Sequence, residues 1–303
     1  HQEARRQRQM CIRDRGCRNH NGVRWTPVDL TKLTQEEFDR FRTFIYAETG
    51  IRLADGKITL LSNRIRRRLR QLEIASFEEY YTLLTQKKLP RELEHFIDAV
   101  TTNETHFFRT GGHFEWFSDS FLPTIRTQAA EKKRPKSLRI WSAACSSGEE
   151  LYTLAICLDE VRHRFAGWNI SLIGTDISET MIAAARQGVF LNRSLDQISD
   201  ERRARYFSQL PDKTGWSIRP RLINTCEFRR HNLLTSMPGE RFDCIFIRNV
   251  LIYFDRESKQ TAVKNLIDAL APGGALVVGP ADGISDLLGE LNKKTIFLYE
   301  KPQ

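Results

Sequence analysis

The sequence predicts an α/β protein in which a mostly parallel, doubly wound sheet follows a small all-helical module. From residue 138 onward, apolar runs of strand length alternate with amphipathic runs of helix length. Such alternation is typical of parallel sheets with helices on both faces. Residues 30–100 instead carry apolar positions at helical spacing. We therefore expect two parts, with any ligand of the sheet at the carboxyl ends of its strands.

The helical module is expected to begin with a helix capped at Thr34. Glu37 follows three residues later, as in a capping box, and Gly50 marks the end of this helix. A second helix, 57–72, has arginines around one apolar stripe, which consists of Leu61, Ile65, Leu69 and Leu72. Two shorter helices are expected at 77–86 and 90–101.

Residues 101–137 are expected to form a linker and cofactor-contacting segment between the module and the sheet, and residues 138–303 to form the sheet domain. Its strands are predicted within the apolar runs 138–144, 170–177, 242–254, 275–279 and 294–301, the last as an edge strand. Short β-like pieces interrupt the alternation, so a small inserted β subdomain is expected at about 206–231.

The first 29 residues are expected to be a disordered tail. They lack apolar periodicity, and MCIRDR at 10–15 reads like a translated sequencing adapter, so residues 1–29 are treated as a stretch of uncertain origin and left out of the fold prediction. Residues 1–30 hold seven arginines and three acids, which supply +4 of the net charge of +9. An RNA-binding tail is the alternative interpretation of this charge.

The composition argues against several classes of protein. No apolar run reaches the length of about 18 residues that a membrane-spanning helix needs, and no signal peptide is visible. The six cysteines have neither the spacing of a zinc site nor that of a disulfide framework. We expect a cytoplasmic protein in a reducing compartment, without a metal site and without insertion into a membrane.

The stretch WSAACSSGEELY, residues 141–152, is the first candidate for a ligand-binding loop. Small residues let a ligand approach the backbone and Gly148 permits a turn, but the GxGxxG fingerprint of dinucleotide sites is absent. Glu149 and Glu150 would repel a pyrophosphate. They would suit a cation such as S-adenosylmethionine, which carries an ammonium and a sulfonium group. Alternatively, both acids simply occupy the first turn of a helix, where the helix dipole favours them.

Asp176 ends the second predicted strand, about thirty residues after the loop. An acid at this position accepts hydrogen bonds from the ribose hydroxyls of an adenosine cofactor. It could instead cap the next helix, but Ser178 or Thr180 could serve that role. A small-residue loop with this acid and without phosphate-binding glycines favours an adenosine cofactor lacking phosphates, and hence a methyltransferase.

Polar residues also interrupt a later strand end. Arg248 and Asn249 lie within an apolar stretch, where burial without a partner would be costly and a ligand would explain them. Asn232 lies in a comparable place, near where an adenine edge would need hydrogen bonds.

The chain resembles the chemotaxis receptor glutamate methyltransferases, the CheR family, over roughly residues 30–302. The resemblance rests on five segments in family order: TTNETHFFRTGGHFEWF (101–117), LRIWSAACSSGEELYTLA (138–155), IGTDIS (173–178), HNLL (231–234) and FIRNVLIYFD (246–255). It implies a Rossmann-like S-adenosylmethionine-dependent methyltransferase fold, with a small all-helical N-terminal domain and a small inserted β subdomain. The implied reaction transfers methyl to glutamate side chains of bacterial chemoreceptors, giving glutamyl methyl esters and S-adenosylhomocysteine.

The resemblance also implies which residues contact the cofactor: Asn103, Thr105, Arg109, Glu149, Asp176, Asn232, Leu233, Arg248 and Asn249. Glu149 is expected to hold the amino group of the methionine moiety, and Asp176 the ribose. Tyr253 is a candidate for orienting the incoming carboxylate through its hydroxyl, or else an aromatic core residue. No general base is required, because a glutamate with a pKa of about 4.3 is already a nucleophile at neutral pH.

The expected partner is the cytoplasmic helical domain of a chemoreceptor, docked on the basic helix 57–72. This helix holds one lysine and five arginines without an acid. A merely solvated face is the alternative, and nucleic acid is less favoured because no exposed aromatics interleave the charges. We expect a monomer that does not bind nucleic acid.

The sequence departs from the family pattern at three places. Ser147 and Leu151 replace a common Thr and Pro, which a loop-to-helix turn should tolerate. Residues 278–286 replace a His-Ser-Glu-like segment, and 210–220 lacks the glycine-rich loop of members that grip a receptor C-terminal peptide, so we expect no such tether. Two alternatives stay open: a methyltransferase acting on RNA or a small molecule, and a non-catalytic adaptor.

Overall fold

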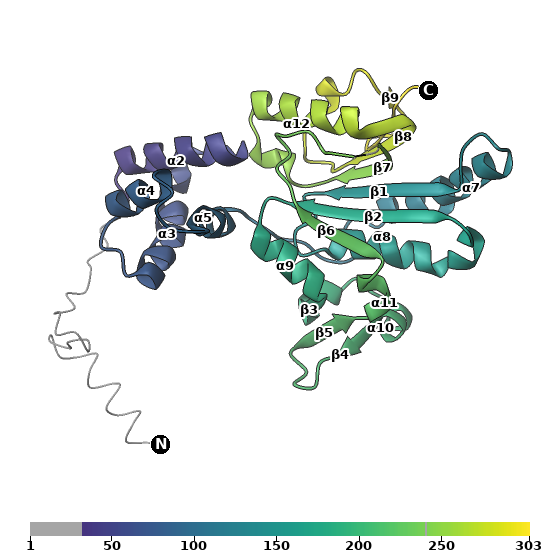
Figure 1. Cartoon of the computed structure of the whole chain (residues 1–303), viewed down its shortest axis with the longest axis horizontal. Helices are drawn as coiled ribbons and strands as arrows, with labels where there is room; N and C mark the ends of the chain where they lie inside the picture. Colours follow the sequence, from purple (N-terminus) through teal and green to yellow (C-terminus); the bar gives the residue numbers. More distant parts are fainter. Residues whose placement is uncertain (1–31, 240) are drawn as a thin grey trace.

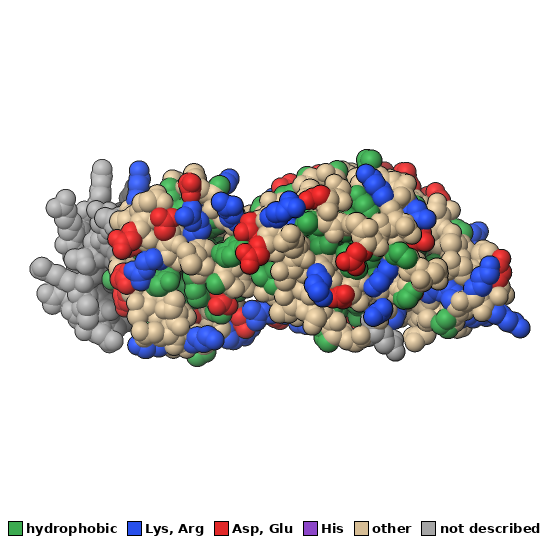
Figure 2. All heavy atoms as spheres, turned by 90° about the horizontal axis from the view of Figure 1, so that it is seen from above, with side chains coloured by type: hydrophobic (Ala, Val, Ile, Leu, Met, Phe, Trp, Pro, Cys, Tyr) green, Lys and Arg blue, Asp and Glu red, His purple; other side chains and the backbone are tan. Residues whose placement is uncertain are grey.

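The computed structural model describes residues 32–239 and 241–303, and the predicted tail of residues 1–29 lies outside them. Within these residues, an all-helical module precedes a mixed α/β part (Figure 1). Seen from above, the two parts form two lobes joined at a narrow waist (Figure 2). No helix in the described residues has the length and apolar character needed to cross a membrane.

The helical module has its own hydrophobic core. Its elements are α2 (Gln35–Thr49), the 3₁₀ turn η1 (Asp55–Lys57), α3 (Ile58–Leu72), α4 (Phe77–Thr85) and α5 (Glu92–Val100). Thr34 and Glu37 form the predicted capping box, and Gly50 ends α2 in the left-handed conformation at φ 73°. Leu61, Ile65 and Leu69 of α3 are buried against α2, α4 and α5, as the apolar stripe predicts.

The segment between the module and the sheet is helical over much of its length, which the prediction of a linker at 101–137 missed. It forms α6 (Gly112–Trp116), the π-helical η2 (Phe117–Phe121) and α7 (Leu122–Ala130). Phe114 stacks on Phe246 of the sheet with ring centroids 5.9 Å apart, and Phe117 contacts the same ring edge-on at 6.1 Å. These aromatic contacts place the segment in the core of the α/β part.

The main sheet has seven strands in the order β6-β2-β1-β7-β8-β10-β9. They are β1 (Ser137–Ala143), β2 (Asn169–Asp176), β6 (Cys226–Arg230), β7 (Phe242–Ile247), β8 (Leu270–Val278), β9 (Asn292–Lys293) and β10 (Leu298–Glu300). The first five strands in this order pair in parallel, and β10 runs antiparallel between β8 and the short β9. The sequence predicted β10 as an edge strand, but β9 lies outside it, so β10 is the second strand from the edge.

Helices cover both faces of this sheet (Figure 1). Ile140 of β1 packs in the core with α8 and α9, whereas its neighbour Trp141 packs on the opposite face with α12. The helices are α8 (Glu149–Glu160), α9 (Glu179–Gln187), α10 (Asp200–Tyr206), α11 (Pro220–Ile223) and α12 (Arg256–Ala269). The short turns are η3 (Arg162–Phe165), η4 (Asn192–Leu195), η5 (Leu251–Tyr253) and η6 (Ser285–Leu287).

The small β subdomain is a three-stranded antiparallel sheet in the order β3-β5-β4. Its strands are β3 (Val189–Leu191), β4 (Phe207–Gln209) and β5 (Gly215–Ile218). The predicted range of 206–231 is therefore shifted: the subdomain begins with β3, and 226–230 is β6 of the main sheet. The sequence of β6 does not look like a buried strand, because only Phe228 of its five residues is buried. The Phe228 ring packs where Gly174 of the neighbouring β2 has no side chain.

A buried ion pair in the module generates a stability prediction. The Glu92 carboxylate, 3% exposed, accepts from Arg68 at 2.6 Å and from the Tyr80 hydroxyl at 2.6 Å. Glu92→Gln should lower the free energy of unfolding by about 3 kcal/mol, because it leaves the partly buried guanidinium without its counter-charge. Chemical denaturation measures this loss.

Glu78→Gln is the matched control for this prediction. Glu78 pairs with Arg40 at the surface of the same module, where solvent screens the charges. The control should leave the denaturation midpoint nearly unchanged. Equal losses in the two variants would contradict the buried-pair interpretation.

Candidate active site

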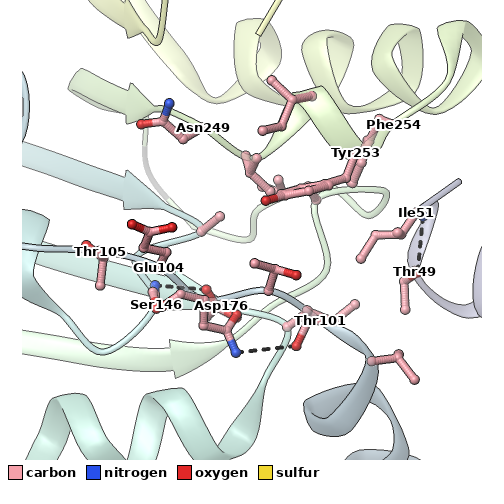
Figure 3. Close-up of a pocket in the computed structure, with 18 of the residues that line it drawn as sticks. Thr49, Ile51, Thr101, Glu104, Thr105, Ser146, Asp176, Asn249, Tyr253 and Phe254 are labelled. Carbon is pink, nitrogen blue, oxygen red and sulfur yellow. Dashed lines mark hydrogen bonds between the residues drawn. The ribbon is translucent and has the colours of Figure 1, made fainter. Parts of the chain in front are cut away.

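A cavity of about 270 Å³ lies where the two lobes meet (Figure 3). The carboxyl ends of β1, β2 and β7 form its floor, and the helical module closes it from the other side. Its lining comes from segments far apart in the sequence: 49–64, 100–109, 144–150, 176–177, 231–233 and 248–254. A cavity therefore lies at the strand ends, where the sequence predicts a ligand site.

The loop after β1 has a tightly bent backbone. Ala144, Ser146 and Gly148 all have positive φ, at 59°, 51° and 95°. A side chain at Gly148 would also meet Ala185 at 3.0 Å and the Phe228 ring at 3.1 Å. The single glycine of the loop therefore serves the turn and the packing beneath it.

Asp176 is the buried acid at the end of β2. Its carboxylate accepts the backbone N–H of Ser146 at 2.9 Å and of Ser178 at 3.0 Å, so it ties the loop to the strand end. Burial raises the pKa of Asp176, and the two backbone hydrogen bonds oppose the rise. The Ser178 hydroxyl caps α9 by accepting from Met181, as predicted, so Asp176 is not the helix cap.

The two adjacent glutamates point in different directions, and the expected ligand contact of Glu149 is not supported by its position. Glu149 is 2% exposed, lies outside the lining of the cavity, and accepts hydrogen bonds from Ser147 and Ser194. Burial raises its pKa. Glu150 lines the cavity instead. Since successive side chains of a helix point about 100° apart, only one of the pair can face the site.

Arg248 connects three segments around the cavity. It donates to the Glu150 carboxylate at 2.9 Å and to the backbone carbonyl of Arg109, and it lies over the Phe114 ring at 5.5 Å. Its side chain is 3% exposed. The guanidinium therefore spans α8, the strand end after β7 and the segment before α6, which makes it a structural member of the site as well as a lining residue.

The structure brings the other predicted residues together at the cavity: Asn103, Thr105, Arg109, Asn232, Leu233, Asn249 and Tyr253. Figure 3 shows the Tyr253 hydroxyl pointing into the space between the strand ends and the module. The Asn232 side chain is already engaged, since it donates to the Glu48 carbonyl at 3.0 Å and accepts from Leu234 at 3.0 Å.

Backbone pairing joins the module to the site. Ile51 forms an isolated antiparallel bridge with Phe254, and the Arg52 N–H donates to the Tyr253 carbonyl at 2.8 Å. Tyr253 and Phe254 belong to the same turn that lines the cavity after β7. The module is therefore part of the wall of the site.

The cavity is also lined by Glu150, His106 and Arg64, which the resemblance did not include among the cofactor contacts. Burial and the neighbouring Arg109 lower the pKa of His106. Arg64, expected among the docking charges of helix 57–72, turns inward and donates to the Thr102 hydroxyl at 3.1 Å; burial lowers its pKa. Its position on the flank of the apolar stripe was the available signal.

These features define a class of protein. A doubly wound sheet, a small-residue loop after its first strand, a buried acid ending its second and no glycine-rich phosphate loop together form the site of an S-adenosylmethionine-dependent methyltransferase. Residues 103–296 match the family described as CheR methyltransferase, SAM binding domain. Residues 36–101 match its companion, CheR methyltransferase, all-alpha domain. The chain belongs to the CheR methyltransferase family, which confirms the resemblance, the fold class, the cofactor and the enzyme class.

Relatives match along most of the chain. A chemotaxis protein methyltransferase 2 of Pseudomonas aeruginosa is 37% identical over 254 residues, covering 82% of this chain and 87% of the relative. The chemotaxis protein methyltransferase of Salmonella typhimurium is 34% identical and covers 89% of this chain and 92% of its own length. The N-methyltransferase NodS of Bradyrhizobium japonicum, solved with S-adenosyl-L-homocysteine, is a more distant likeness: 17% identity, a TM-score of 0.35, and coverage of 55% of this chain and 79% of NodS.

Proposed function

We propose that this protein transfers the methyl group of S-adenosylmethionine to glutamate side chains of chemoreceptors, giving glutamyl methyl esters and S-adenosylhomocysteine. The observation that carries the proposal is the cavity, which joins the cofactor-type strand ends of the sheet to the arginine-rich helix of the module. The relatives named chemotaxis protein methyltransferase support the choice of substrate. The enzyme works in the cytoplasm as a monomer, on the cytoplasmic helical domain of the receptor.

The cofactor lies over the strand ends in this proposal. The free lone pairs of the Asp176 carboxylate accept from the ribose hydroxyls, while its contact with the Ser146 N–H holds the loop. Glu150 takes the role first expected of Glu149, because a carboxylate facing the cavity attracts the ammonium of the methionine moiety. The adenosine and methionine lie among Asn103, Thr105, Arg109, Asn232, Leu233, Arg248 and Asn249.

The methyl transfer needs orientation more than acid–base chemistry. An ionised glutamate attacks the sulfonium methyl in line; the carbon–sulfur bond breaks and its electron pair stays on the sulfur of S-adenosylhomocysteine. The Tyr253 hydroxyl points into the cavity, where it can donate to one carboxylate oxygen and hold the other toward the methyl (Figure 3). His106 also lines the cavity, where burial lowers its pKa and so favours the neutral imidazole. A carboxylate nucleophile gives it no proton to accept.

The receptor docks on the outer face of α3 in this proposal. Lys57, Arg67 and Arg70 are exposed, whereas Arg64 and Arg68 make contacts within the protein. The docking face is therefore smaller than the charge count of helix 57–72 suggests. Lys57 also lines the cavity, so the basic face continues to the mouth of the site. Glutamate-rich receptor helices complement this charge.

Glu150→Gln should weaken binding of S-adenosylmethionine by about tenfold or more, because the amide balances neither the ligand ammonium nor the buried Arg248 guanidinium with which Glu150 is paired. Glu149→Gln should leave the affinity near that of the wild type, since this side chain lies outside the cavity lining. Isothermal titration calorimetry, well below the unfolding temperature of each variant, measures both constants. The reverse order of effects would return the role to Glu149.

The reaction itself is tested with S-adenosylmethionine labelled in the methyl group and receptor-rich membranes. Label should enter receptor proteins and leave them as methanol in base, as expected of a glutamyl ester. His106→Gln should retain kcat within about threefold, whereas loss of a general base costs about 10² to 10⁴ in rate. Base-stable label, or a kcat that collapses in His106→Gln, would redirect the proposal to an amine or hydroxyl substrate. Cofactor binding without any transfer would indicate an adaptor.

Reversal of the docking charges should act on the receptor alone. The double variant R67E/R70E should raise the KM for receptor about tenfold and weaken its salt dependence, with the affinity for S-adenosylmethionine unchanged. K132E/K133E is the control, because both lysines are exposed just before the amino end of β1, opposite the strand ends that carry the cavity. An equal rise in KM for the two variants would contradict docking on α3.

A further inference from the structure

A buried carboxylate behind the cavity has no role in the proposal above. Asp282 is 0% exposed and does not line the cavity. It lies in 278–286, the segment that departs from the pattern of the family. A buried carboxylate is costly unless its oxygens accept hydrogen bonds, so the partners of Asp282 indicate what it does.

The carboxylate of Asp282 accepts four hydrogen bonds, and all four donors are backbone N–H groups. One oxygen, Oδ2, accepts from Asn249 at 2.9 Å and from Gly279 at 3.0 Å. The other, Oδ1, accepts from Val250 at 3.1 Å and from Leu251 at 3.0 Å. Each oxygen therefore serves two donors, and three of the four donors are consecutive residues of one turn.

That turn, residues 248–254, is the wall of the cavity after β7. It presents Arg248, Asn249 and Tyr253 to the cavity. Asn249 has φ 61°, in the left-handed region that residues other than glycine seldom adopt. The N–H groups of this bend point to one side, where the Asp282 carboxylate accepts hydrogen bonds from three of them. The carboxylate thus stabilises a bend that a non-glycine residue would otherwise resist.

Two neighbours keep the carboxylate in place. A Cβ on Gly279 would lie 2.4 Å from Oδ2 of Asp282 and 3.0 Å from the Asn249 nitrogen, so only glycine fits beside the carboxylate. Lys259 of α12 donates its ammonium to the backbone carbonyls of Asp282 at 2.8 Å and Gly283 at 3.3 Å. The anchor is therefore built from the loop after β8 and from α12.

We propose that Asp282 is a positioning residue, which fixes the turn 248–254 so that its side chains meet the cofactor and the methyl-accepting carboxylate. This positioning role rests on the proposed function only in that the methyl acceptor is taken to be a glutamate carboxylate of the receptor. Cofactor affinity reports on the turn whichever substrate is methylated. Failure of receptor methylation in the wild type would leave the inference about Asp282 open to test by cofactor binding.

The choice of variant follows from the pairing of the donors. Asp282→Asn keeps the shape but leaves one acceptor oxygen, so two backbone N–H groups would face an NH₂ group. The bend should relax, and S-adenosylmethionine should bind about tenfold or more weakly. Receptor methylation at saturating cofactor should also fall, because Tyr253 moves with the turn. Calorimetry, initial rates and thermal unfolding measure the three quantities.

Asp286→Asn is the matched control. Asp286 lies four residues after Asp282 in the same segment and makes an exposed ion pair with Arg256. Loss of this pair should change neither the affinity for S-adenosylmethionine nor the methylation rate. A lower unfolding temperature in Asp282→Asn with wild-type affinity and kcat would make Asp282 merely structural and overturn the proposal.

Gly279→Ala disturbs the contact between the Asp282 carboxylate and the turn without changing Asp282 itself. This variant tests the proposal if Asp282→Asn fails to fold. The new methyl group displaces the carboxylate without removing its charge. Weaker cofactor binding with retained helix content supports the proposal. Wild-type cofactor affinity in this variant overturns it.

Discussion

The buried guanidinium of Arg248 is the contact on which the site depends. It joins the Glu150 carboxylate at the start of α8 to the Arg109 carbonyl, and its own backbone continues β7. Removing one partner of a buried pair costs about 3–5 kcal/mol, because the remaining charge stays in the protein without compensation. The guanidinium of Arg248 therefore fixes the floor and the wall of the cavity relative to each other, through partners that lie far apart in the sequence.

Local signals were enough to predict the class of fold and much of the helical module. The Thr34–Glu37 box, Gly50 and the apolar stripe of α3 depend only on residues within a few turns of each other. Asp176 could also be placed, since the rule that ligands meet the carboxyl ends of parallel strands requires no side-chain geometry. The cavity formed there agrees with that rule.

What the sequence could not reveal depends on orientation and on long-range packing. The choice between Glu149 and Glu150 turns on the phase of a helix at its first residue, which a motif does not record. β6 was assigned to the subdomain because its one buried residue, Phe228, fills space left by a glycine on another strand. The partners of Asp282 are backbone N–H groups, and no side-chain pattern announces them.

The bridge between Ile51 and Phe254 makes the helical module and the cavity wall one mechanical unit. A ligand that shifts the turn after β7 must also shift the strand-like segment that leads into α3. If the receptor docks on α3 as proposed, a change of cofactor affinity caused by the receptor is matched, by thermodynamic reciprocity, by an equal change of receptor affinity caused by the cofactor. In that case, exchange of S-adenosylhomocysteine for S-adenosylmethionine would change the receptor affinity to the extent that the two molecules place the turn after β7 differently.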